Sequence, residues 1–243
     1  MILKILRNVL ITLLILIILS GTILLILGNN MYSDALDGNT LEEVIDEIQS
    51  SPNYIEYEDL PQNYINAVIA VEDHRFREHG AIDIIAICRA IYINVTHFAL
   101  LEGGSTITQQ VAKNIFYITE TNPVVRKTAE ILTAFDLENK YSKNEILELY
   151  VNTIYFGDGY YGIEEAAKGY LDKTCTEMTL ADCTMMAGIP NAPSVYAPTV
   201  NSDLTRSRQE KVISSMVEYG YLTQVDSENL INSLDTYYLQ FEN

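Results

Sequence analysis

The chain has 243 residues, of which 48% are hydrophobic, and it carries a formal net charge of −18. This length suits one membrane segment and one domain of about 200 residues, and it leaves too little chain for two full-sized domains. The strong acidity argues against a nucleic acid as the partner, because phosphate backbones bind basic surfaces.

An almost wholly aliphatic segment, residues 9–27, comes first along the chain. As a helix it would extend about 28 Å, which matches the hydrocarbon thickness of a bilayer. Lys4 and Arg7 precede the segment, whereas only acidic charges follow it closely, so the positive-inside rule places the N-terminus in the cytoplasm and the remainder outside. A cleaved secretory signal is the alternative. Because residues 28–38 offer only a poor cleavage site, we favour an uncleaved, single-pass anchor in the cytoplasmic membrane.

The acidic stretch after the anchor contains one helical pattern. LEEVIDEIQ (41–49) places apolar residues at helical spacing and predicts a short amphipathic helix beside the membrane. Ser51, Pro52 and Pro61 interrupt the next segment, which we interpret as a turn-rich connector. The predicted organisation is an anchor at 1–30, a juxtamembrane helix and connector at 31–60, and a domain at 61–243.

The next two predicted helices include the first candidate for catalysis. NAVIAVED (66–73) begins a helix whose apolar run ends directly in Glu72, and AIDIIAICRAIYINV (81–95) predicts a strongly apolar helix. Burial against apolar neighbours would raise the pKa of Glu72 and suit it to acid/base chemistry. A solvated helix charge is the simpler alternative.

The residues around the second of these helices have mostly structural interpretations. Asp73, His79 and Asp83 are expected to cap and hydrogen-bond a turn. Cys88 lies in the apolar run and is expected to be a buried thiol. We expect most apolar side chains of this helix in the core. The residues considered for contact with lipid instead are Ile84, Ile85 and Ile91.

EGGSTITQQVAKN (102–114) concentrates hydroxyl and amide side chains after two glycines. It predicts a flexible turn leading into a helix at 108–116, with Gln109, Gln110 and Lys113 near its start. The freed backbone amides of a helix N-terminus favour anions. This stretch therefore predicts an anionic or highly hydroxylated ligand, with a solvated loop as the alternative.

Another helix is predicted at 124–139, after the breaking sequence TNP at 121–123. Glu130 follows Arg126 and Lys127 by one helical turn, and both cations would hold its carboxylate ionised. A surface ion pair is the alternative interpretation. Glu130 would thus stay ionised, whereas the pKa of Glu72 would be raised. Two carboxylates that differ in this way can divide the acid and base roles of a reaction.

Basic residues are concentrated in this middle part of an otherwise acidic chain. Of the 15 Lys and Arg residues, eight fall between Arg75 and Lys143. They are either solvated helix charges or a dedicated anion site. The residues considered for an anion site are Lys113, Arg126, Lys127, Lys140 and Lys143.

The last part of the chain is predicted to be helical with two long loops. Ser142 and Glu145 form a capping-box pattern, and Thr179 with Asp182 forms a looser one. Strand-like alternation is scarce, so the sequence predicts a mainly α-helical domain with long functional loops. The predicted loops are FGDGYYG (156–162) and IPNAPSVYAPTV (189–200).

The cysteines and histidines define neither a disulfide pattern nor a metal site. Cys175 and Cys183 either form a disulfide or remain two free thiols. The histidines lack metal-ligand spacing and therefore predict no structural zinc site. They are His74, His79 and His97.

Four blocks in sequence resemble the motifs of the bacterial peptidoglycan glycosyltransferase family, glycosyltransferase family 51. They are EDHRFREHGAID, EGGSTITQQVAKN, the stretch from RKTAEIL to AAKGYL, and AGIPNAPSVYAP, and together they cover residues 67–198. The family comprises the transglycosylase domain of class A penicillin-binding proteins and monofunctional membrane enzymes. Four blocks in the family's order and spacing are far more specific than a single motif.

The resemblance implies a lysozyme-like, two-lobed, mainly α-helical fold with a substrate groove, near the outer face of the membrane. It implies a reaction with a growing lipid-linked glycan as donor and lipid II as acceptor. Glu72 matches the family's catalytic glutamate and Glu130 its second glutamate. The positions assigned to substrate and diphosphate binding are Asp73, Phe76, Ser105, Thr106, Gln109, Gln110, Lys113, Arg126 and Lys127.

The chemistry of the residues agrees with this assignment. Converting an α-linked sugar diphosphate into a β-1,4 glycan requires inversion, so a base must deprotonate the attacking 4-hydroxyl, and Glu72 is our candidate. The departing diphosphate needs cations, which Lys113, Arg126 and Lys127 would supply. Glu130 would orient these cations or help hold a divalent ion, Mg²⁺ or Mn²⁺, on the diphosphate. No cofactor is expected to be obligatory.

Two departures from the family pattern are visible. Ala81 stands where the family usually has glycine, so the turn after His79 is expected to differ. No S-x-x-K transpeptidase motif follows the fourth block, which indicates a monofunctional enzyme or a truncated chain.

Other functions stay open at this point. A lysozyme-like hydrolase or lytic enzyme would also use an acidic pair in a sugar groove, but it has no use for a cation cluster. A non-catalytic membrane scaffold would not need Glu72, Glu130 and Lys113 together. The expected partners are lipid II, the lipid-linked nascent glycan, the membrane and other cell-wall synthesis proteins, without nucleic acid.

Overall fold

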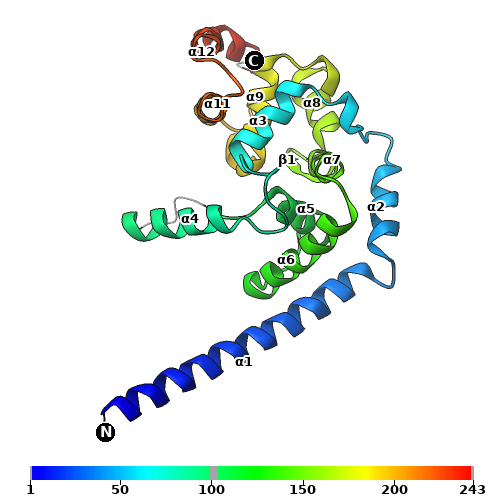
Figure 1. Cartoon of the computed structure of the whole chain (residues 1–243). Coiled ribbons are helices and arrows are strands. Elements are labelled where there is room, and N and C mark those ends of the chain that lie inside the picture. Colours follow the sequence, from blue (N-terminus) through cyan, green and yellow to red (C-terminus); the bar gives the residue numbers. More distant parts are fainter. Residues whose placement is uncertain (1, 99–102, 242–243) are drawn as a thin grey trace.

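Almost all regular structure in the chain is helical, as the computed structural model in Figure 1 shows for residues 2–98 and 103–241. The prediction of a mainly α-helical domain is confirmed. In chain order the elements are α1 (Ile2–Leu36), α2 (Leu41–Gln49), η1 (Tyr57–Asp59), α3 (Gln62–Glu72), α4 (Ile84–His97), α5 (Ile107–Phe116), α6 (Pro123–Lys140), α7 (Lys143–Thr153), β1 (Tyr155–Gly157), β2 (Tyr160–Tyr161), α8 (Ile163–Leu171), η2 (Cys175–Glu177), α9 (Leu180–Gly188), η3 (Ile189–Asn191), α10 (Pro193–Tyr196), α11 (Ser202–Glu218), α12 (Gln224–Tyr238) and η4 (Leu239–Phe241).

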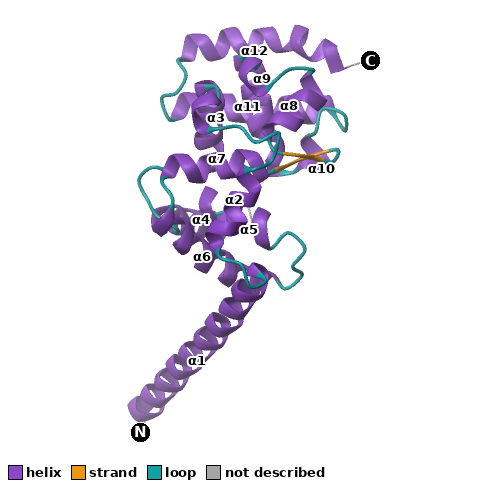
Figure 2. Cartoon of the chain, turned by 90° about the vertical axis from the view of Figure 1, so that its right-hand side faces the viewer, coloured by secondary structure: helices purple, strands orange, loops and turns teal. Residues whose placement is uncertain are grey.

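The first helix, α1, extends from the rest of the molecule as a long rod (Figure 2). Among the described residues it is the one helix long and apolar enough to cross a membrane, which fits a membrane anchor or a signal sequence. The helix does not end at residue 30, where we placed a boundary, but continues to Leu36. Its last turns pack against the core through Met31, Ala35 and Leu36.

One lobe is built around α3 and α9, whose residues are buried on nearly all sides. In α3, Tyr64, Ile65 and Val68 are among the six buried residues, and in α9 every residue from Asp182 to Gly188 is buried. Helices that are apolar all round have to be enclosed by others. Accordingly, α3 packs against both α9 and α11, and α12 packs on α11 at the top of Figure 1.

The second lobe contains α4, α5 and α6 and lies nearer to α1 (Figure 1). Its centre is α5, which packs against α6 and α7 and buries Ile107, Val111 and Ala112. The chain crosses from α3 in the first lobe to α4 in the second through residues 73–83. The side chains at this crossing therefore lie where the two lobes meet.

The predicted helix caps are present. At the start of α7, the Ser142 N–H donates to Glu145 Oε2 at 2.6 Å and the Glu145 N–H donates to Ser142 Oγ at 3.4 Å. Thr179 and Asp182 form the corresponding pair at the start of α9. The predicted helix at 41–49 is confirmed as α2.

Several predicted boundaries were wrong. NAVIAVED does not begin a helix but forms the second half of α3, which starts at Gln62. Helix α5 ends at Phe116 as predicted, but it starts one residue earlier, at Ile107. The predicted loop 189–200 contains η3 and α10, and the predicted loop 156–162 is largely a β-hairpin in which Tyr155 pairs with Tyr161.

Helix α4 differs most from the expectation that its apolar residues lie in the core. Ile84, Ile91 and Tyr92 are 72%, 58% and 70% exposed, and Ala90 is the only buried residue of the helix. Cys88 is exposed as well, so the prediction of a buried thiol was wrong. The cause is its position at the edge of the lobe, where no further helix of the described chain covers it (Figure 1).

Candidate active site

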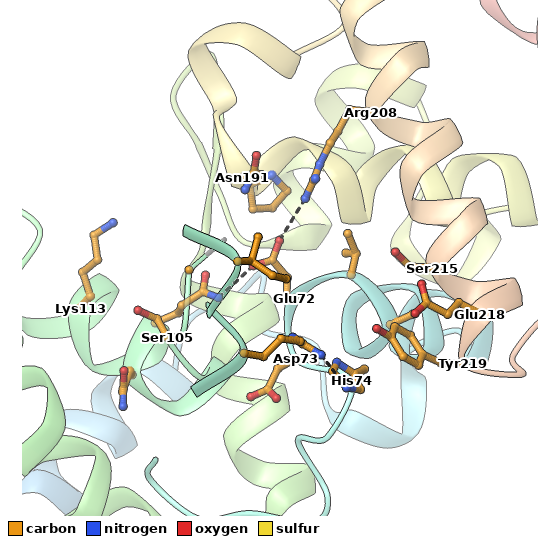
Figure 3. Close-up of a pocket in the computed structure, with 18 of the residues that line it drawn as sticks. Glu72, Asp73, His74, Ser105, Lys113, Asn191, Arg208, Ser215, Glu218 and Tyr219 are labelled. Carbon is orange, nitrogen blue, oxygen red and sulfur yellow. Dashed lines mark hydrogen bonds and ion pairs between the residues drawn. The ribbon is translucent and has the colours of Figure 1, made fainter. Parts of the chain in front are cut away.

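A cleft of about 810 Å³ opens where the two lobes meet. Its walls come from the end of α3, η3 and α11 in the first lobe and from α4, α5 and α6 in the second. Figure 3 shows the side chains that line it, with Glu72 near the centre. This single cleft contains both predicted glutamates and two of the three predicted diphosphate cations, Lys113 and Lys127.

Glu72 is the last residue of α3, so the apolar helix ends with a carboxylate directed into the cleft. Its Oε2 accepts a hydrogen bond of 2.9 Å from Gln110 Nε2, and its Oε1 lies 3.6 Å from Arg208 Nη2. Burial raises the pKa of Glu72, and the Gln110 hydrogen bond and the Arg208 charge offset part of this rise. The structure thus gives Glu72 the environment predicted from its apolar neighbours.

Arg208 is the main residue of this site that sequence reasoning missed. It comes from α11, more than 130 positions after Glu72, and donates from Nε to Gly188 O at 3.3 Å. One signal was available. Arg208 shares a helical face with Val212 and Ser215, of which Val212 is buried and Ser215 lines the cleft. The charged sequence RSRQEK conceals that periodicity.

The second glutamate, Glu130, lies on α6 within a compact cation cluster. Its Oε1 is 3.2 Å from Arg126 Nε and its Oε2 is 3.0 Å from Lys127 Nζ. Lys127 Nζ also donates to Ser105 Oγ at 2.8 Å. Lys127, Glu130 and Ser105 line the cleft, whereas Arg126 is not among the lining residues and donates to Glu120 O at 3.2 Å.

Lys113 and Gln110 extend from α5 on the same side of the cleft. Gln110 reaches Glu72, as described. Lys113 is exposed, lies to one side of Glu72 in Figure 3, and makes no ion pair with any residue that the structure describes. Its ammonium group is therefore free to meet an anionic ligand.

Other predicted binding residues are occupied by contacts within the protein. Asp73 Oδ2 accepts from the Ile107 N–H at 3.0 Å, and Asp73 Oδ1 pairs with His79 Nε2 at 2.8 Å. Thr106 Oγ1 accepts from the Gln109 N–H and donates to Ala81 O. The start of α5 thus already uses these amide donors, which corrects the expectation of a free helix N-terminus for an anion.

Two further side chains predicted to bind substrate are internal. Gln109 is 2% exposed and donates from Nε2 to Ala81 O at 2.8 Å, although it forms part of the cleft wall. Phe76 is 0% exposed, does not line the cleft, and packs beneath Lys143 Nζ at 4.4 Å from its ring centroid. Phe76 supports the loop after Glu72 as a core residue.

The alanine that replaces the usual glycine fits without strain. Ala81 is 2% exposed, and neither it nor Gly80 is among the residues with positive φ. Its carbonyl receives the hydrogen bonds from Thr106 and Gln109, which join the α3–α4 crossing to α5. This position therefore needs a well-placed carbonyl rather than the freedom of glycine.

A cluster of possible metal ligands lies below the cleft but is internally bonded. One ligand atom from each of Asp73, His79 and Asp83 lies within 4.8 Å of the others. Asp83 caps α4 and its Oδ2 accepts from Arg75 Nε at 3.1 Å. Burial alone would lower the pKa of His79, but its hydrogen bonds to Asp73 and Gly80 O raise it. The cluster thus holds the turn, as predicted.

The far end of the cleft is formed by His74 and α11. The His74 ring stacks on Tyr219 with centroids 4.2 Å apart and planes 6° from parallel. Burial lowers the pKa of His74, and the charge of Arg89 adds to this effect. Ser215 and Glu218 complete this wall (Figure 3). None of these residues was predicted as part of the site.

Comparisons with known proteins point to one family. The family model described as transglycosylase matches residues 37–217. A Cupriavidus necator protein that is named as a transglycosylase is 38% identical over 217 residues, which cover 88% of this chain and 90% of that protein. Penicillin-binding protein 1F of Bacillus subtilis is 42% identical over 165 residues, which cover 68% of this chain and only 23% of that protein.

Among solved structures, the crystal structure of penicillin-binding protein 1A from Haemophilus influenzae aligns with a TM-score of 0.44 and 22% identity. The alignment covers 73% of this chain and 17% of that one.

Proposed function

This chain belongs to the transglycosylase family, and we propose that it polymerises lipid II into β-1,4-linked glycan strands, with inversion at the anomeric carbon and release of polyprenyl diphosphate. One observation carries the proposal. A buried glutamate with a raised pKa shares one cleft with two lysines, one of which is free of ion pairs among the described residues. A base and an anion site side by side are what this substitution reaction requires.

Glu72 is the proposed general base. Its carboxylate would take the proton of the acceptor 4-hydroxyl as that oxygen attacks the anomeric carbon of the donor. The bond from this carbon to the diphosphate oxygen breaks, and the diphosphate leaves with the electron pair. Gln110 supports the role by holding Oε2 of Glu72 while Oε1 makes no hydrogen bond within the described residues.

Lys113 and Lys127 are the proposed contacts for the leaving diphosphate. Both line the cleft, and Lys113 has no competing ion pair in the described chain. A fixed cation lowers the energy of negative charge that develops on a leaving group. Arg126 would act through Glu130 rather than on the substrate, since Arg126 pairs with Glu130 and does not line the cleft.

Glu130 is proposed to orient the cations. Each of its carboxylate oxygens already pairs with one cation, so Glu130 has no free oxygen for Mg²⁺ or Mn²⁺. A divalent ion that accompanied the substrate would be held by the diphosphate oxygens themselves. We therefore place no metal ligand on this residue.

The proposed location is the outer surface of the cytoplasmic membrane, with α1 as an uncleaved anchor and its N-terminus inside. Donor and acceptor both carry polyprenyl tails, so an enzyme tethered to the same surface meets them at a higher effective concentration. Lipid II and the nascent glycan are the proposed partners. We assign no ligand to the acidic surface elsewhere on the chain.

The proposal is tested by replacing Glu72 with glutamine in the full chain. Because Gln cannot accept the proton, Glu72→Gln should reduce lipid II polymerisation by about 10²–10⁴-fold, the usual contribution of general-base catalysis. The matched control is Glu78→Gln, which changes an acid of the same loop that is 66% exposed. It should polymerise at the wild-type rate.

Three results would contradict the proposal. Wild-type protein that leaves lipid II unchanged but releases fragments from mature peptidoglycan would indicate a hydrolase. Wild-type protein without either activity would indicate a scaffold. Full polymerisation by Glu72→Gln would show that another group is the base.

A further inference from the structure

The last turns of α1 approach α6 unusually closely. A Cβ atom added to Gly28 would lie 2.7 Å from Thr128 Cγ2 and 3.2 Å from the Ala129 backbone nitrogen. One turn later, Tyr32 Oη donates to Asp136 Oδ2 at 2.8 Å. Any side chain at position 28 would therefore push the two helices apart.

The same turn of α6 carries the cation cluster. Thr128, which meets Gly28, directly follows Lys127 in the chain and precedes Glu130 by two residues. One face of this turn thus contacts α1, and another supplies Lys127 and Glu130 to the cleft. Figure 1 shows α6 lying between α1 and α5. If α1 moved relative to α6, the position of Lys127 and Glu130 along α1 would therefore change.

Gly28 directly follows the aliphatic segment 9–27, so its contact with α6 lies at the membrane boundary if α1 spans the bilayer. The diphosphate of a polyprenyl-linked substrate is held at the same level, because its tail is confined to the hydrocarbon. A rigid helix–helix contact fixes the height of a domain over the membrane, whereas a flexible linker leaves it variable.

We propose that Gly28 is a positioning residue, whose close contact with Thr128 sets the height of the Lys127 cluster above the bilayer to that of a lipid-linked diphosphate. This inference rests on the proposed function and on α1 remaining as the anchor. The contact is expected to act on position more than on the shape of the anion site, because α5 packs against α6 far more extensively than against α1.

The chain provides a matched control for this idea. Gly21 lies two turns earlier in α1 and has no atom within 4 Å of an added Cβ. Gly21→Leu and Gly28→Leu thus make the same chemical change in the same helix, and only the second disturbs the contact with α6. Tyr32→Phe is a milder second variant, which removes the hydroxyl bonded to Asp136 and retains the ring.

The test compares two anions against full-length protein in nanodiscs. One probe is a long-chain polyprenyl diphosphate in the bilayer, and the other is inorganic pyrophosphate in solution. Since a misplacement of about 1 Å can cost about 100-fold, we expect Gly28→Leu to weaken the membrane-bound probe by about tenfold or more. It should leave pyrophosphate binding unchanged. Gly21→Leu should match wild type for both probes, and Tyr32→Phe should show a smaller loss for the membrane-bound probe alone.

Each other outcome overturns a stated part of the argument. If Gly28→Leu weakens both probes equally, the contact maintains the shape of the site and does not set its height. If Gly28→Leu binds both as wild type does, the contact has no role in positioning. If wild-type protein binds neither probe, the anion site of the proposed function is wrong, and this inference fails with it.

Discussion

Glu72 and Arg208 form an ion pair between two helices of one lobe, α3 and α11, with Oε1 of the glutamate 3.6 Å from Nη2 of the arginine. The Arg208 side chain is only 14% exposed, so water screens the pair weakly. Arg208 favours the carboxylate form of Glu72 against the effect of burial. The pKa of the base is thus adjusted by a residue that is distant in the chain but lies on a neighbouring helix of the same lobe.

Replacing Arg208 should therefore alter the pH profile. A base is active when deprotonated, so polymerisation falls as the pH drops through the pKa of Glu72, which burial already raises above its ordinary value. Arg208→Gln removes a charge that lowers this pKa, so the acidic limb should move to higher pH. The measurement is the rate of lipid II polymerisation against pH.

The control for this prediction is Arg206→Gln on the same helix. Arg206 pairs with Glu210 and Asp235 outside the cleft, so its removal should leave the acidic limb in place. An acidic limb in Arg208→Gln that coincides with that of wild type would show that Arg208 does not act on Glu72.

The two lysines of the cleft should contribute to binding of a charged diphosphate and not to binding of an uncharged glycan. Loss of one charged hydrogen bond costs about 1.5–3 kcal/mol, so Lys113→Ala or Lys127→Ala should weaken a diphosphate ligand by about 10–100-fold. Binding of an uncharged glycan should hardly change. Lys140→Ala is the control, because Lys140 pairs with Glu42 away from the cleft. Calorimetry with both ligands checks this, and equal losses for both would contradict an anion site.

At this scale, the sequence predicts a residue's environment when the cause lies nearby in the chain. The apolar run before Glu72 was enough to predict its apolar environment. The spacing of Glu130 after Arg126 and Lys127 was enough to predict its two ion pairs. The occupied polar groups of Thr106 and Gln109 were not predictable, because their partner is the carbonyl of Ala81 in another segment.

Among the elements, α4 is the one whose apolar face lacks a partner in the described chain. Ile84, Ile91 and Val95 are 72%, 58% and 64% exposed, on a helix that projects from the lobe nearer to α1 (Figure 1). An apolar surface of this kind, beside a helix that we propose as a membrane anchor, is expected to lie in lipid. Helices α5 and α6 show the opposite case, since their apolar faces meet each other and α7.

A tryptophan probe can test this placement, because the chain contains no Trp of its own. Tyr92→Trp replaces a residue of α4 that is 70% exposed. Its fluorescence should be strongly quenched by lipids brominated in their acyl chains. Tyr161→Trp, at a position 52% exposed in the β-hairpin, is the matched control and should be unaffected. Equal fluorescence of Tyr92→Trp in brominated and ordinary lipid would place α4 in water.

Helix existence was easier to predict than helix surroundings. The Ser142 capping box and the 41–49 pattern located α7 and α2, because caps and periodicity are local. The same local pattern could not tell whether α4 is covered by protein or by lipid, since an apolar helix satisfies both. Its exposure is set by how the lobes are arranged.

For the whole molecule, the relation between anchor and domain departs from the predicted division at residue 30. Hydropathy falls after residue 27, so the sequence indicates an end to the membrane segment there. The helix nevertheless continues to Leu36, and its polar turns dock on the domain through Met31 and the Tyr32–Asp136 hydrogen bond. Residues 28–36 therefore pack as part of the domain, although they continue the helix that contains the apolar segment.

Shortened variants can separate these two roles. A variant beginning at Gly28 retains the docked turns, whereas one beginning at Gly38 loses the packing of Met31, Ala35 and Leu36 on the core. Since fully burying one such side chain contributes about 1.5–3 kcal/mol and these are partly buried, the loss should be about 3 kcal/mol. For a domain of about 200 residues this corresponds to a Tm lower by about 6–12 °C. Thermal unfolding in one detergent measures the difference, and equal Tm values would mean that the docked turns contribute nothing to the fold and serve only to connect it to the membrane.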